Sequence, residues 1–463
     1  MDMVNVKING IAVSVPKGST ILEAARYAGV EIPTLCFLKE INEIGACRIC
    51  VVEASEGGRP ARLVTACVYP VSEGMEVTTN SKKVQQNRRI TLELILSTHE
   101  KKCLSCVRST NCELQKMCRD YGVEDSGQYD GFRPHYEEDT SAPHLIRDNN
   151  KCILCRRCVA ACRQQFVSVI GANDRGLDTH IACAFEKPLD ETPCVSCGQC
   201  IVACPTGALQ EKDDTPKVWE ALNDPTKHVV VGPAPSVRVT LGECFGMPIG
   251  TNVEGKMVAA LRRLGFDGVF DTDTAADFTI MEEATEFVQR VKNGGTPPLI
   301  TSCSPGWVKF CETYYPDMIP NLSSCKSPQQ MFGAVAKTYF AERAGIDPAK
   351  IVSVSVMPCT AKKAEAAREE MCASGYRDVD VVITTRELGR MIREAGIDFN
   401  ALAEAEFDSP LGTGTGAAVI FGTTGGVMEA ALRTVAEVVA GKELPKLEYN
   451  EVRGMEQTRE AVI

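Results

Sequence analysis

Two cysteine runs decide how this chain folds: Cys152-Ile-Leu-Cys155-Arg-Arg-Cys158-Val-Ala-Ala-Cys162 and Cys194-Val-Ser-Cys197-Gly-Gln-Cys200-Ile-Val-Ala-Cys204-Pro205. Each run has the spacing C-x2-C-x2-C-x3-C, which is typical of ligands to [4Fe–4S] clusters. In such paired runs the fourth cysteine of each run ligates the other cluster. The spacing therefore predicts one cluster on Cys152, Cys155, Cys158 and Cys204, and a second on Cys162, Cys194, Cys197 and Cys200. Because two such clusters carry electrons one at a time, we expect the protein to transfer electrons.

Length and composition indicate a multidomain protein of a reducing compartment. The chain has 463 residues, enough for several domains. Its 23 cysteines would suggest disulfides in a small secreted protein, but residues 1–7 have a strand pattern without the apolar segment of a signal peptide. Metal ligation in the cytoplasm is the preferred interpretation. The net charge of −11 argues against a nucleic-acid partner, and no apolar run is long enough to span a membrane.

Residues 1–80 are predicted to form a small domain around another set of cysteines. Alternating valine and isoleucine residues on both sides of Asn9-Gly10 indicate a hairpin, and Thr20-Ile-Leu-Glu23 is a capping box that opens a helix ending near Gly29. With the spacing Cys36-x10-Cys47-x2-Cys50-x16-Cys67, this order resembles the β-grasp fold of plant-type [2Fe–2S] ferredoxins, although the first gap is longer than in that pattern. A zinc site on the same four cysteines is the alternative.

A third group of ligand-type residues, His99-x3-Cys103-x2-Cys106-x5-Cys112, follows a predicted helix over residues 82–96. One histidine and three cysteines suit structural zinc as well as a cluster. Because the group lies between two cluster modules, a [4Fe–4S] with one histidine ligand is favoured for residues 81–120. Replacing a thiolate by imidazole removes a negative charge and should raise the reduction potential.

The remaining chain is predicted to contain a linker, the two-[4Fe–4S] ferredoxin-like domain and an α/β domain. Residues 121–145 are rich in Asp, Glu, Gly and Pro and have the composition of a linker, and residues 146–211 hold the two cysteine runs. A second linker is predicted over 212–227. From there apolar strands at 228–231, 351–356 and 379–383 alternate with helices at 278–292, 328–344 and 387–394, an α/β pattern for residues 225–463. The whole is thus an α+β and α/β multidomain chain.

Three segments of the α/β domain stand out: Thr301-Ser-Cys303-Ser304-Pro-Gly-Trp307, Asn321–Gln330, and Met357-Pro358-Cys359-Thr-Ala-Lys362-Lys-Ala-Glu365. Cys303 and Cys359 are each expected just beyond a strand end, where α/β folds place their sites. The first and last segments resemble the TSCCPGW and MPCxxKxxE motifs of the [FeFe]-hydrogenases. The N-terminal series of clusters resembles the accessory domains of the larger members, so the resemblance covers essentially the whole chain.

The resemblance implies a reaction, a cofactor and a set of site residues. The reaction is the reversible joining of two protons and two electrons into H2, at an H-cluster made of a [4Fe–4S] and a diiron site. Cys359 matches a ligand of its [4Fe–4S], and Lys362 matches the lysine that contacts a diiron cyanide. Cys303, Glu283, Glu286 and Ser323 match the proton relay. Pocket-lining positions match Ala234, Pro235, Ser236, Pro328, Gln329, Met357 and Pro358.

Taken without the resemblance, several of these residues have plainer interpretations. Glu283 and Glu286 could form a solvated helix face, Lys362 could be a surface lysine, and Ser323 could be a helix N-cap. Gly412-Thr-Gly-Thr-Gly416 could bind a nucleotide, but a close backbone approach is favoured because the third spaced glycine is missing. The cysteines without partner spacing are expected to be buried apolar residues: Cys118, Cys183, Cys244, Cys311 and Cys372.

The sequence departs from the family pattern in two places. Ser304 stands where the family has a cysteine ligand to the [4Fe–4S], so Ser304, Cys303 or Cys325 is expected to supply that ligand. The family's third motif, with two more cysteines, is expected beyond Ile463. A C-terminally truncated hydrogenase is therefore the preferred interpretation, with the chain as given expected to be inactive. A protein that has lost hydrogenase chemistry is the alternative.

The leading hypothesis is thus an iron-only hydrogenase, or a fragment of its catalytic subunit. Its electron partner is expected to be ferredoxin or a flavin-containing subunit that oxidises NAD(P)H. One alternative is an electron-transfer subunit with a degenerate hydrogenase-like domain. The other is the iron–sulfur subunit of an NADH dehydrogenase, against which the motifs after Gly232 argue.

Overall fold

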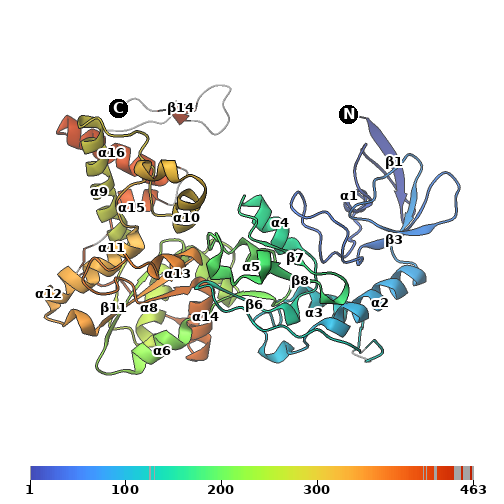
Figure 1. The fold of residues 1–463 in the computed structure, drawn as a ribbon, viewed down its shortest axis with the longest axis horizontal. Helices are drawn as coiled ribbons and strands as arrows, with labels where there is room; N and C mark the ends of the chain where they lie inside the picture. Colours follow the sequence, from blue (N-terminus) through green and yellow to red (C-terminus); the bar gives the residue numbers. More distant parts are fainter. Residues whose placement is uncertain are drawn as a thin grey trace. The chain divides into compact units, whose positions relative to one another are not determined.

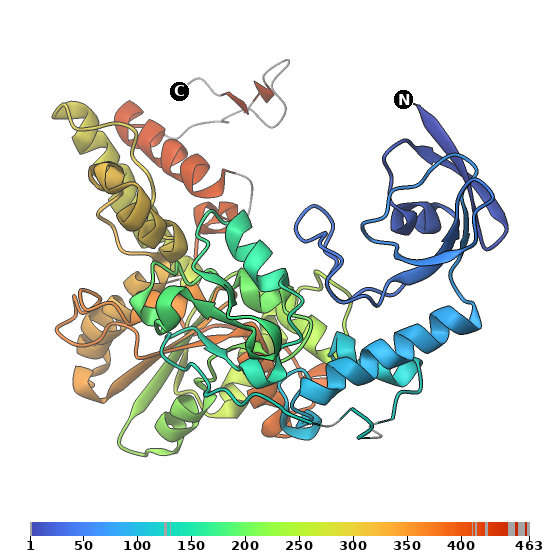
Figure 2. The same ribbon diagram turned by 45° about the vertical axis from the view of Figure 1, so that its right-hand side comes forward.

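A computed structural model describes residues 2–124, 127–129, 131–409, 411–412, 414–421, 425–442, 450–451 and 459–460. The chain forms two compact units. Unit 1 comprises residues 1–194 and 198–212, and unit 2 comprises residues 195–197 and 213–463. The elements of each unit can be followed by colour in Figure 1 and Figure 2. In the described part of the chain no helix combines the length and the apolar character needed to cross a bilayer.

Unit 1 begins with a five-stranded sheet that is covered by one helix. The strand order is β2(Ile11–Pro16)-β1(Met3–Ile8)-β5(Glu76–Thr78)-β3(Val51–Ser55)-β4(Arg62–Thr65). β1 and β2 pair antiparallel with Ile8 opposite Ile11, so the predicted Asn9-Gly10 hairpin is confirmed. β5 pairs parallel with β1, which closes the sheet over α1(Ile21–Tyr27). The predicted capping box of Thr20 and Glu23 opens α1 as expected.

The rest of unit 1 is made of helices and short two-stranded ladders that carry the cysteine runs. These elements are α2(Lys82–Thr98), η1(Cys103–Ser105), α3(Glu113–Asp120), β6(Leu145–Arg147), α4(Arg157–Gln164), β7(Ile170–Asn173), β8(His180–Cys183), α5(Gln199–Ala203) and β9(Leu209–Glu211). β6 pairs with β9 and β7 pairs with β8, both antiparallel. Residues 121–144 contain no helix and no strand among those described.

The two cysteine runs fold locally in the same way. Arg156 and Gly198, each one residue after the second cysteine of its run, adopt left-handed backbone with φ of 60° and 71° and directly precede α4 and α5. Leu154 and Ser196 also have positive φ, 53° and 60°. A left-handed residue turns the chain sharply, so successive cysteines can face a common centre. The repeat in spacing is therefore also a repeat in backbone conformation.

Unit 2 is built on a four-stranded sheet in which every pairing is parallel. The order is β11(Gly268–Val269)-β10(His228–Pro233)-β12(Ile351–Met357)-β13(Val381–Thr384). The helices are α6(Thr215–Asn223), α7(Val237–Thr240), α8(Glu254–Leu264), α9(Thr272–Lys292), α10(Pro305–Tyr314), α11(Pro328–Val335), α12(Ala341–Ala344), α13(Ala361–Ala366), α14(Thr385–Glu394), α15(Gly416–Ile420) and α16(Gly426–Ala440), with a π-helical turn, η8(Ala336–Phe340), between α11 and α12. The predicted α/β alternation is confirmed.

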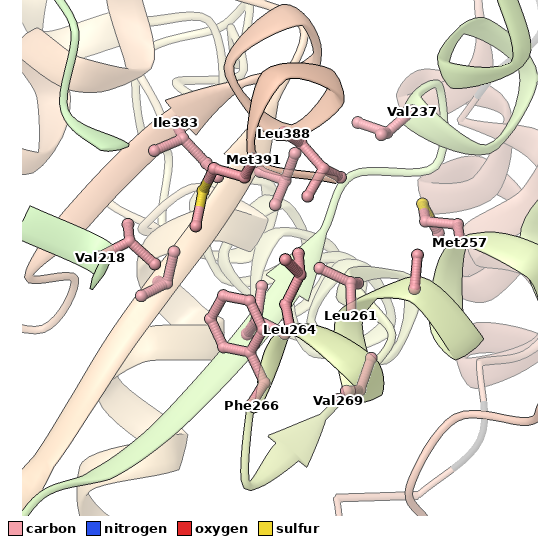
Figure 3. Close-up of a cluster of buried hydrophobic side chains, with 14 of the residues drawn as sticks. Val218, Val237, Met257, Leu261, Leu264, Phe266, Val269, Ile383, Leu388 and Met391 are labelled. Carbon is pink, nitrogen blue, oxygen red and sulfur yellow. The ribbon is translucent and has the colours of Figure 1, made fainter. Parts of the chain in front are cut away.

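Both faces of this sheet are covered, because alternate residues of β10 enter different cores. Val229 and Val231 pack in a core with α8 and α14, whereas Val230 packs with aromatic residues near α9 and α11. In Figure 3 side chains of Leu261 and Leu388, from α8 and α14, point into the first core. A period of two along a strand places successive side chains on opposite faces. The carboxyl ends of β10 and β12 are left for the loops that carry the motifs.

Two sequence expectations in unit 2 were wrong. The segment 212–227, expected to be a linker, contains α6, which begins with Pro216 in its first turn and buries Val218 in the core. The segment before Cys303 is not a strand of the sheet: only Ile300 forms an isolated bridge, with Leu322. Pro297 and Pro298 have no N–H to donate to a ladder, which accounts for the missing strand.

Candidate functional site

The four cysteines of the N-terminal set lie together in unit 1. All four are buried, and Cys50 Sγ lies 3.2 Å from Cys67 Sγ. Hydrogen bonds with the thiols of Cys47 and Cys67 lower the pKa of Cys36. The same interactions with Cys36 raise the pKa of Cys47 and that of Cys67. A hydrogen bond with Cys67 also lowers the pKa of Cys50, so packing of the set favours thiolate, the form that binds iron.

The histidine of the second set is buried in a form suited to metal binding. His99 follows α2 as its C-cap, and its Nδ1 has no hydrogen-bond partner. Burial lowers the pKa of His99 to about 4, so the ring is neutral near pH 7. The loop of this set is tied to the second cysteine run: Cys112 Sγ lies 3.7 Å from the Pro205 carbonyl, and Arg108 donates to the Cys204 carbonyl at 2.9 Å.

A small cavity in unit 1 is lined by the four cysteines expected to bind one [4Fe–4S]: Cys152, Cys155, Cys158 and Cys204. The cavity has a volume of about 20 Å³. Burial raises the pKa of Cys152 and that of Cys155 to about 12. These thiols therefore hold their protons until a cation replaces them. The crossed pairing of the two runs brings Cys204 to the first three cysteines.

Three of the four cysteines expected to bind the second [4Fe–4S] belong to unit 1. Cys162, Cys194 and Cys200 are half-buried residues of unit 1, and His144 Nε2 lies 3.9 Å from Cys194 Sγ. Cys197 belongs to the three-residue segment grouped with unit 2.

In unit 2 the pocket-lining residues predicted from the resemblance lie at the carboxyl edge of the sheet. Ala234, Pro235 and Ser236 follow β10, and Pro358 and Cys359 follow the neighbouring strand β12. Ala234 N–H donates to the Val356 carbonyl at 2.9 Å, so the two loops start side by side. In open parallel sheets this edge is where ligands bind.

Lys362 connects three of the motif segments through hydrogen bonds. Its Nζ donates to the Cys303 carbonyl at 2.8 Å and to Glu365 Oε2 at 3.0 Å. Gln329, from α11, donates to the Lys362 carbonyl at 3.2 Å and to Glu365 Oε2 at 3.0 Å. The Lys362 side chain is 13 % exposed, so the surface-lysine interpretation is wrong. The network thus links the segment of Cys303 to that of Cys359 through the ammonium of Lys362, which Glu365 holds in place.

Glu283 and Glu286 lie on α9 in different surroundings. Glu283 is 2 % exposed, and neither carboxylate oxygen makes a hydrogen bond, although the Ser323 hydroxyl is near enough to affect its pKa. Burial raises the pKa of Glu283. Burial alone would also raise the pKa of Glu286, but hydrogen bonds from Arg290 and Ser324 hold it below its ordinary value. The solvated-face interpretation is wrong for Glu283.

Ser323 and its neighbours connect the outer glutamate to a cavity. Ser323 Oγ and Ser324 Oγ donate to Glu286 Oε2 at 3.3 and 3.0 Å, and Cys325 Sγ lies 3.9 Å from the same oxygen. Ser323 does not cap a helix; that role belongs to Ser327, before α11. A cavity of about 320 Å³ is lined by 13 residues that include Ser302, Ser323, Cys325 and Glu365.

Cys303 and Ser304 both precede α10. Cys303 is half-buried, and burial raises the pKa of its thiol while the nearby Lys362 lowers it. Ser304 is exposed and is the N-cap of α10, yet its hydroxyl makes no capping bond.

The glycine-rich segment and the leftover cysteines were predicted only in part. A Cβ on Gly414 would lie 2.9 Å from Asp273 Cβ, which agrees with a close backbone approach; Thr413 lies outside the described residues. Cys183 and Cys311 are buried as expected, and Cys118 and Cys244 are half-buried. Cys372 is exposed, so the expectation was wrong for it: it lies in the turn before β13 and not in a core.

Two groups at the site had no signal in the sequence. Arg290, one helical turn after Glu286, donates to its Oε1 from Nε at 3.0 Å. Lys363 is buried and donates to Asp214 Oδ2 at 2.7 Å and to Glu387 Oε1 at 2.8 Å. Asp214 and Glu387 lie far from Lys363 in the sequence, so no local spacing could reveal this cluster.

The residues at this edge of the sheet in unit 2 fit a bound metal cluster that carries polar ligands. Several buried polar atoms near the motifs have no hydrogen-bond partner: Gln329 Oε1, both amide atoms of Gln330, Trp307 Nε1 and the two oxygens of Glu283. Buried polar atoms without partners are costly unless a ligand or water satisfies them. Thiols are available from Cys303, Cys325 and Cys359. Soft sulfur ligands are those that iron–sulfur clusters select.

Comparison with protein families gives matches along most of the chain. The family described as iron only hydrogenase large subunit, C-terminal domain, matches residues 227–463. A 2Fe-2S iron-sulfur cluster binding domain matches residues 1–82, and the NADH-ubiquinone oxidoreductase-G iron-sulfur binding region matches residues 88–127. A 4Fe-4S dicluster domain matches residues 151–208.

Two curated relatives match the chain over its full length, and a third matches part of it. The NADP-reducing hydrogenase subunit HndD of Solidesulfovibrio fructosivorans is 50% identical over 475 residues, covering 100% of this chain and 80% of the relative. Iron hydrogenase 1 of Clostridium pasteurianum is 45% identical over 464 residues, with the same two coverages of 100% and 80%. The periplasmic [Fe] hydrogenase large subunit of Nitratidesulfovibrio vulgaris is 44% identical over 309 residues, covering 59% of this chain and 73% of the relative.

Proposed function

The chain belongs to the iron-only hydrogenase family, and we propose how its residues divide the work of this enzyme. It is a hydrogenase-type catalytic subunit with iron–sulfur domains, an oxidoreductase that interconverts H2 with protons and electrons. The observation that carries the proposal is the Lys362 network. This network joins Cys303, Gln329 and Glu365 at the sheet edge where Cys359 also lies.

We propose four electron-transfer clusters along the N-terminal part. A β-grasp domain over 1–80 would hold a [2Fe–2S] on Cys36, Cys47, Cys50 and Cys67. Residues 81–120 would hold a [4Fe–4S] on His99, Cys103, Cys106 and Cys112, followed by a linker over 121–145. Residues 146–211 would hold two [4Fe–4S] clusters, one on Cys152, Cys155, Cys158 and Cys204, the other on Cys162, Cys194, Cys197 and Cys200. The cavity lined by Cys152, Cys155, Cys158 and Cys204 supports the crossed assignment.

Residues 225–463 would form the domain that holds the H-cluster. When bound, this group supplies the metal site at which protons and electrons combine. Cys359 is proposed as one ligand, with Ser304, Cys303 or Cys325 as a second. Lys362, fixed by Glu365, would neutralise an anionic metal ligand. The pocket around the group would be closed by Ala234, Pro235, Ser236, Pro328, Gln329, Met357 and Pro358.

Protons would move between the surface cavity and the metal group through Glu286, Ser323, Glu283 and Cys303. Glu286 is kept ionised by Arg290, so it can accept a proton at the cavity. Ser323 contacts Glu286 and lies near Glu283, and a hydroxyl can accept one proton while donating another. Buried Glu283 has a raised pKa and can hold the proton before it passes to Cys303.

The electron partner is a redox protein, and we propose ferredoxin or a flavin-containing NAD(P)H-oxidising subunit. The name of the NADP-reducing relative favours the second. We also propose a cytoplasmic location, because the 23 cysteines suit a reducing compartment. The periplasmic relative makes fractionation of cells the appropriate check.

Replacing Cys303 with alanine tests the proposed relay. Activity is measured on the holoenzyme, with all of its clusters assembled. Cys303→Ala should lose H2 turnover but keep the [4Fe–4S] signal of unit 2, because the relay is interrupted and the ligands remain. Cys311→Ala, which removes a buried thiol on α10, is the control and should keep turnover. Loss of the cluster signal in Cys303→Ala would make Cys303 a ligand and refute its proposed role.

A further inference from the structure

One buried side chain in unit 1 joins the loop of the N-terminal cysteine set to the first [4Fe–4S] run. Asn42 is 3 % exposed. Its Nδ2 donates to the Cys36 carbonyl at 2.7 Å and to the Cys155 carbonyl at 3.0 Å. Cys36 and Cys155 belong to different proposed clusters. The two hydrogen bonds therefore make a short connection between the ligand residues of two redox groups.

The backbone of Asn42 is itself fixed, so the direction of its side chain is set. Asn42 N–H donates to the Leu38 carbonyl at 2.8 Å, and Leu38 N–H donates to the Asn42 carbonyl at 3.0 Å. This closes a small ring of chain directly after Cys36. An amide nitrogen has two N–H donors, so one asparagine can satisfy two carbonyls at once. Neither aspartate, which has no donor when ionised, nor serine, which has one, could do the same.

Two further features hold the same two segments together. Arg157, which directly precedes the ligand residue Cys158, is buried and donates to the Phe37 carbonyl at 3.2 Å. Side chains from both segments also share one apolar cluster, which includes Leu35, Cys36, Cys47, Ile49, Leu92 and Cys155. The hydrogen bonds of Asn42 thus lie in a dry region, where they are less exposed to competition from water.

We propose that Asn42 is a positioning residue for electron transfer between the [2Fe–2S] and the [4Fe–4S] on Cys152, Cys155, Cys158 and Cys204. This inference rests on the proposed ligand sets. In the step one electron leaves the reduced [2Fe–2S] and enters the oxidised [4Fe–4S]; no bond breaks and no proton moves. Electron tunnelling becomes much slower when covalent and hydrogen-bonded contact is replaced by a gap. The amide of Asn42 supplies that contact and fixes the spacing of the two carbonyls.

The test is Asn42→Leu, which keeps a branched side chain of similar size and removes both donors. Asn173→Leu is the matched control, because Asn173 Nδ2 also donates to a backbone carbonyl in unit 1, that of Cys183, which is no proposed ligand. The full chain is reconstituted with iron and sulfide. Iron content and thermal unfolding are measured first. Electron paramagnetic resonance then follows the microwave-power saturation of the reduced [2Fe–2S] signal and, after one-electron photoreduction and freeze-quenching, the transfer of the electron to the [4Fe–4S].

With full iron content, Asn42→Leu should transfer the electron several-fold more slowly, and its [2Fe–2S] signal should saturate at lower power. Asn173→Leu should match the wild type in both. Unchanged transfer and saturation in Asn42→Leu would overturn the inference. If Asn42→Leu loses iron, the same measurements are made on Asn42→Ser and Asn42→Ala, and these decide whether the inference holds. Loss of iron in all three variants would make Asn42 a purely structural residue and would also overturn the inference. If the wild type lacks one of the two clusters, the proposed ligand sets fail instead.

Discussion

At the scale of single residues, burial decides which charged and polar side chains can take part in chemistry. Glu283 and Glu286 are one helical turn apart, but only the carboxylate of Glu286 accepts hydrogen bonds. Their pKa values are therefore displaced in opposite directions, by burial for Glu283 and by Arg290 and Ser324 for Glu286. A pair of carboxyl groups with different proton affinities can pass a proton in steps, which two solvated glutamates could not do in a directed way.

Asp273, in the first turn of α9, should make unit 2 less stable as the pH rises. Burial, with Asp271 nearby, raises its pKa from 3.8 to about 6. A carboxyl whose pKa is raised by folding contributes stability that is fully present below its unfolded pKa and lost as the pH rises through the folded pKa, here between about 4 and 6. At pH 8 the free energy of unfolding of Asp273→Asn should therefore be about 1–3 kcal/mol higher than that of the wild type. Near pH 4 the two proteins should not differ in this way.

Chemical denaturation of the full chain at the two pH values, followed by a probe in unit 2, measures this difference. Glu282→Gln, which removes an exposed carboxylate from the same helix, is the matched control. An Asp273→Asn variant that loses stability at pH 8 would mean that the ion pair with Arg238, at 3.5 Å, outweighs the cost of burial.

Ser304→Cys should increase the iron held by unit 2. Ser304 is proposed to stand at a ligand position, and thiolate is a better ligand for iron–sulfur clusters than serine. The exchange should change the free energy of unfolding by less than about 0.5 kcal/mol, because the side chain is exposed and makes no capping bond. Iron analysis and the [4Fe–4S] signal check this, with Ser409→Cys, at another exposed serine of unit 2, as the control. Equal iron in both variants would point to Cys303 or Cys325 as the existing ligand.

At the scale of elements, the short helix α13 is fixed from two sides. Lys362 and Glu365 attach it to Gln329 of α11, and Lys363 attaches it to Asp214 and Glu387. A helix of 6 residues is too short to be stable alone, so these contacts must hold it. Glu387 also closes the capping box of α14 with Thr384, which sets the position of one anchor.

Removing the cation between Asp214 and Glu387 should therefore strongly destabilise unit 2. Lys363→Met leaves buried Glu387 without its cation and Asp214 with only the exposed Lys217, at 2.7 Å, and is expected to cost about 3–5 kcal/mol. The triple variant Lys363→Met, Asp214→Asn, Glu387→Gln should recover most of this loss, because no unpaired charge remains. Thermal and chemical unfolding measure both, with exposed Lys350→Met as the control. If the single and triple variants lose the same free energy of unfolding, the loss comes from disturbed packing geometry and not from unpaired charge.

At the scale of the whole molecule, unit 1 contains a large number of proposed metal ligands for its size. These cysteines occur in apolar clusters as well as in loops, so we expect folding and metal binding to depend on each other. Gly207 illustrates how tightly the segments pack: a Cβ there would lie 2.6 Å from Cys106 Sγ. Clusters bound at these positions would form part of the core.

Reconstituted protein should therefore bind roughly fourteen iron atoms in its N-terminal sets, from one [2Fe–2S] and three [4Fe–4S] clusters. Metal analysis of the full chain, with the H-cluster contribution removed by Cys359→Ala, gives this number. His99→Cys should lower the reduction potential of one cluster and leave the others unchanged, because thiolate adds negative charge. Stoichiometric zinc with little iron would contradict the cluster assignment and favour the zinc alternatives.

Much of the architecture could be predicted because it depends on local pattern. The alternating strands around Asn9-Gly10 and the capping box at Thr20 formed as predicted, since each involves residues within a few positions. The positions of Cys359 and of the cysteine runs were also predictable. Spacing along the chain limits how far apart two ligands can lie, and this favours a shared centre.

What the sequence could determine by itself was the chemical type of the protein: iron–sulfur ligands in sets, and a hydrogenase-like active-site domain. Only the tertiary structure decided which side chains connect these parts. Asn42 meets Cys155 across 113 positions and Lys363 meets Asp214 across 149, so neither contact has a local pattern. The burial of Glu283 and the missing strand before Cys303 likewise depend on what packs nearby. Ligand spacing is a property of the covalent chain, whereas burial and hydrogen-bond partners arise only when distant segments pack together.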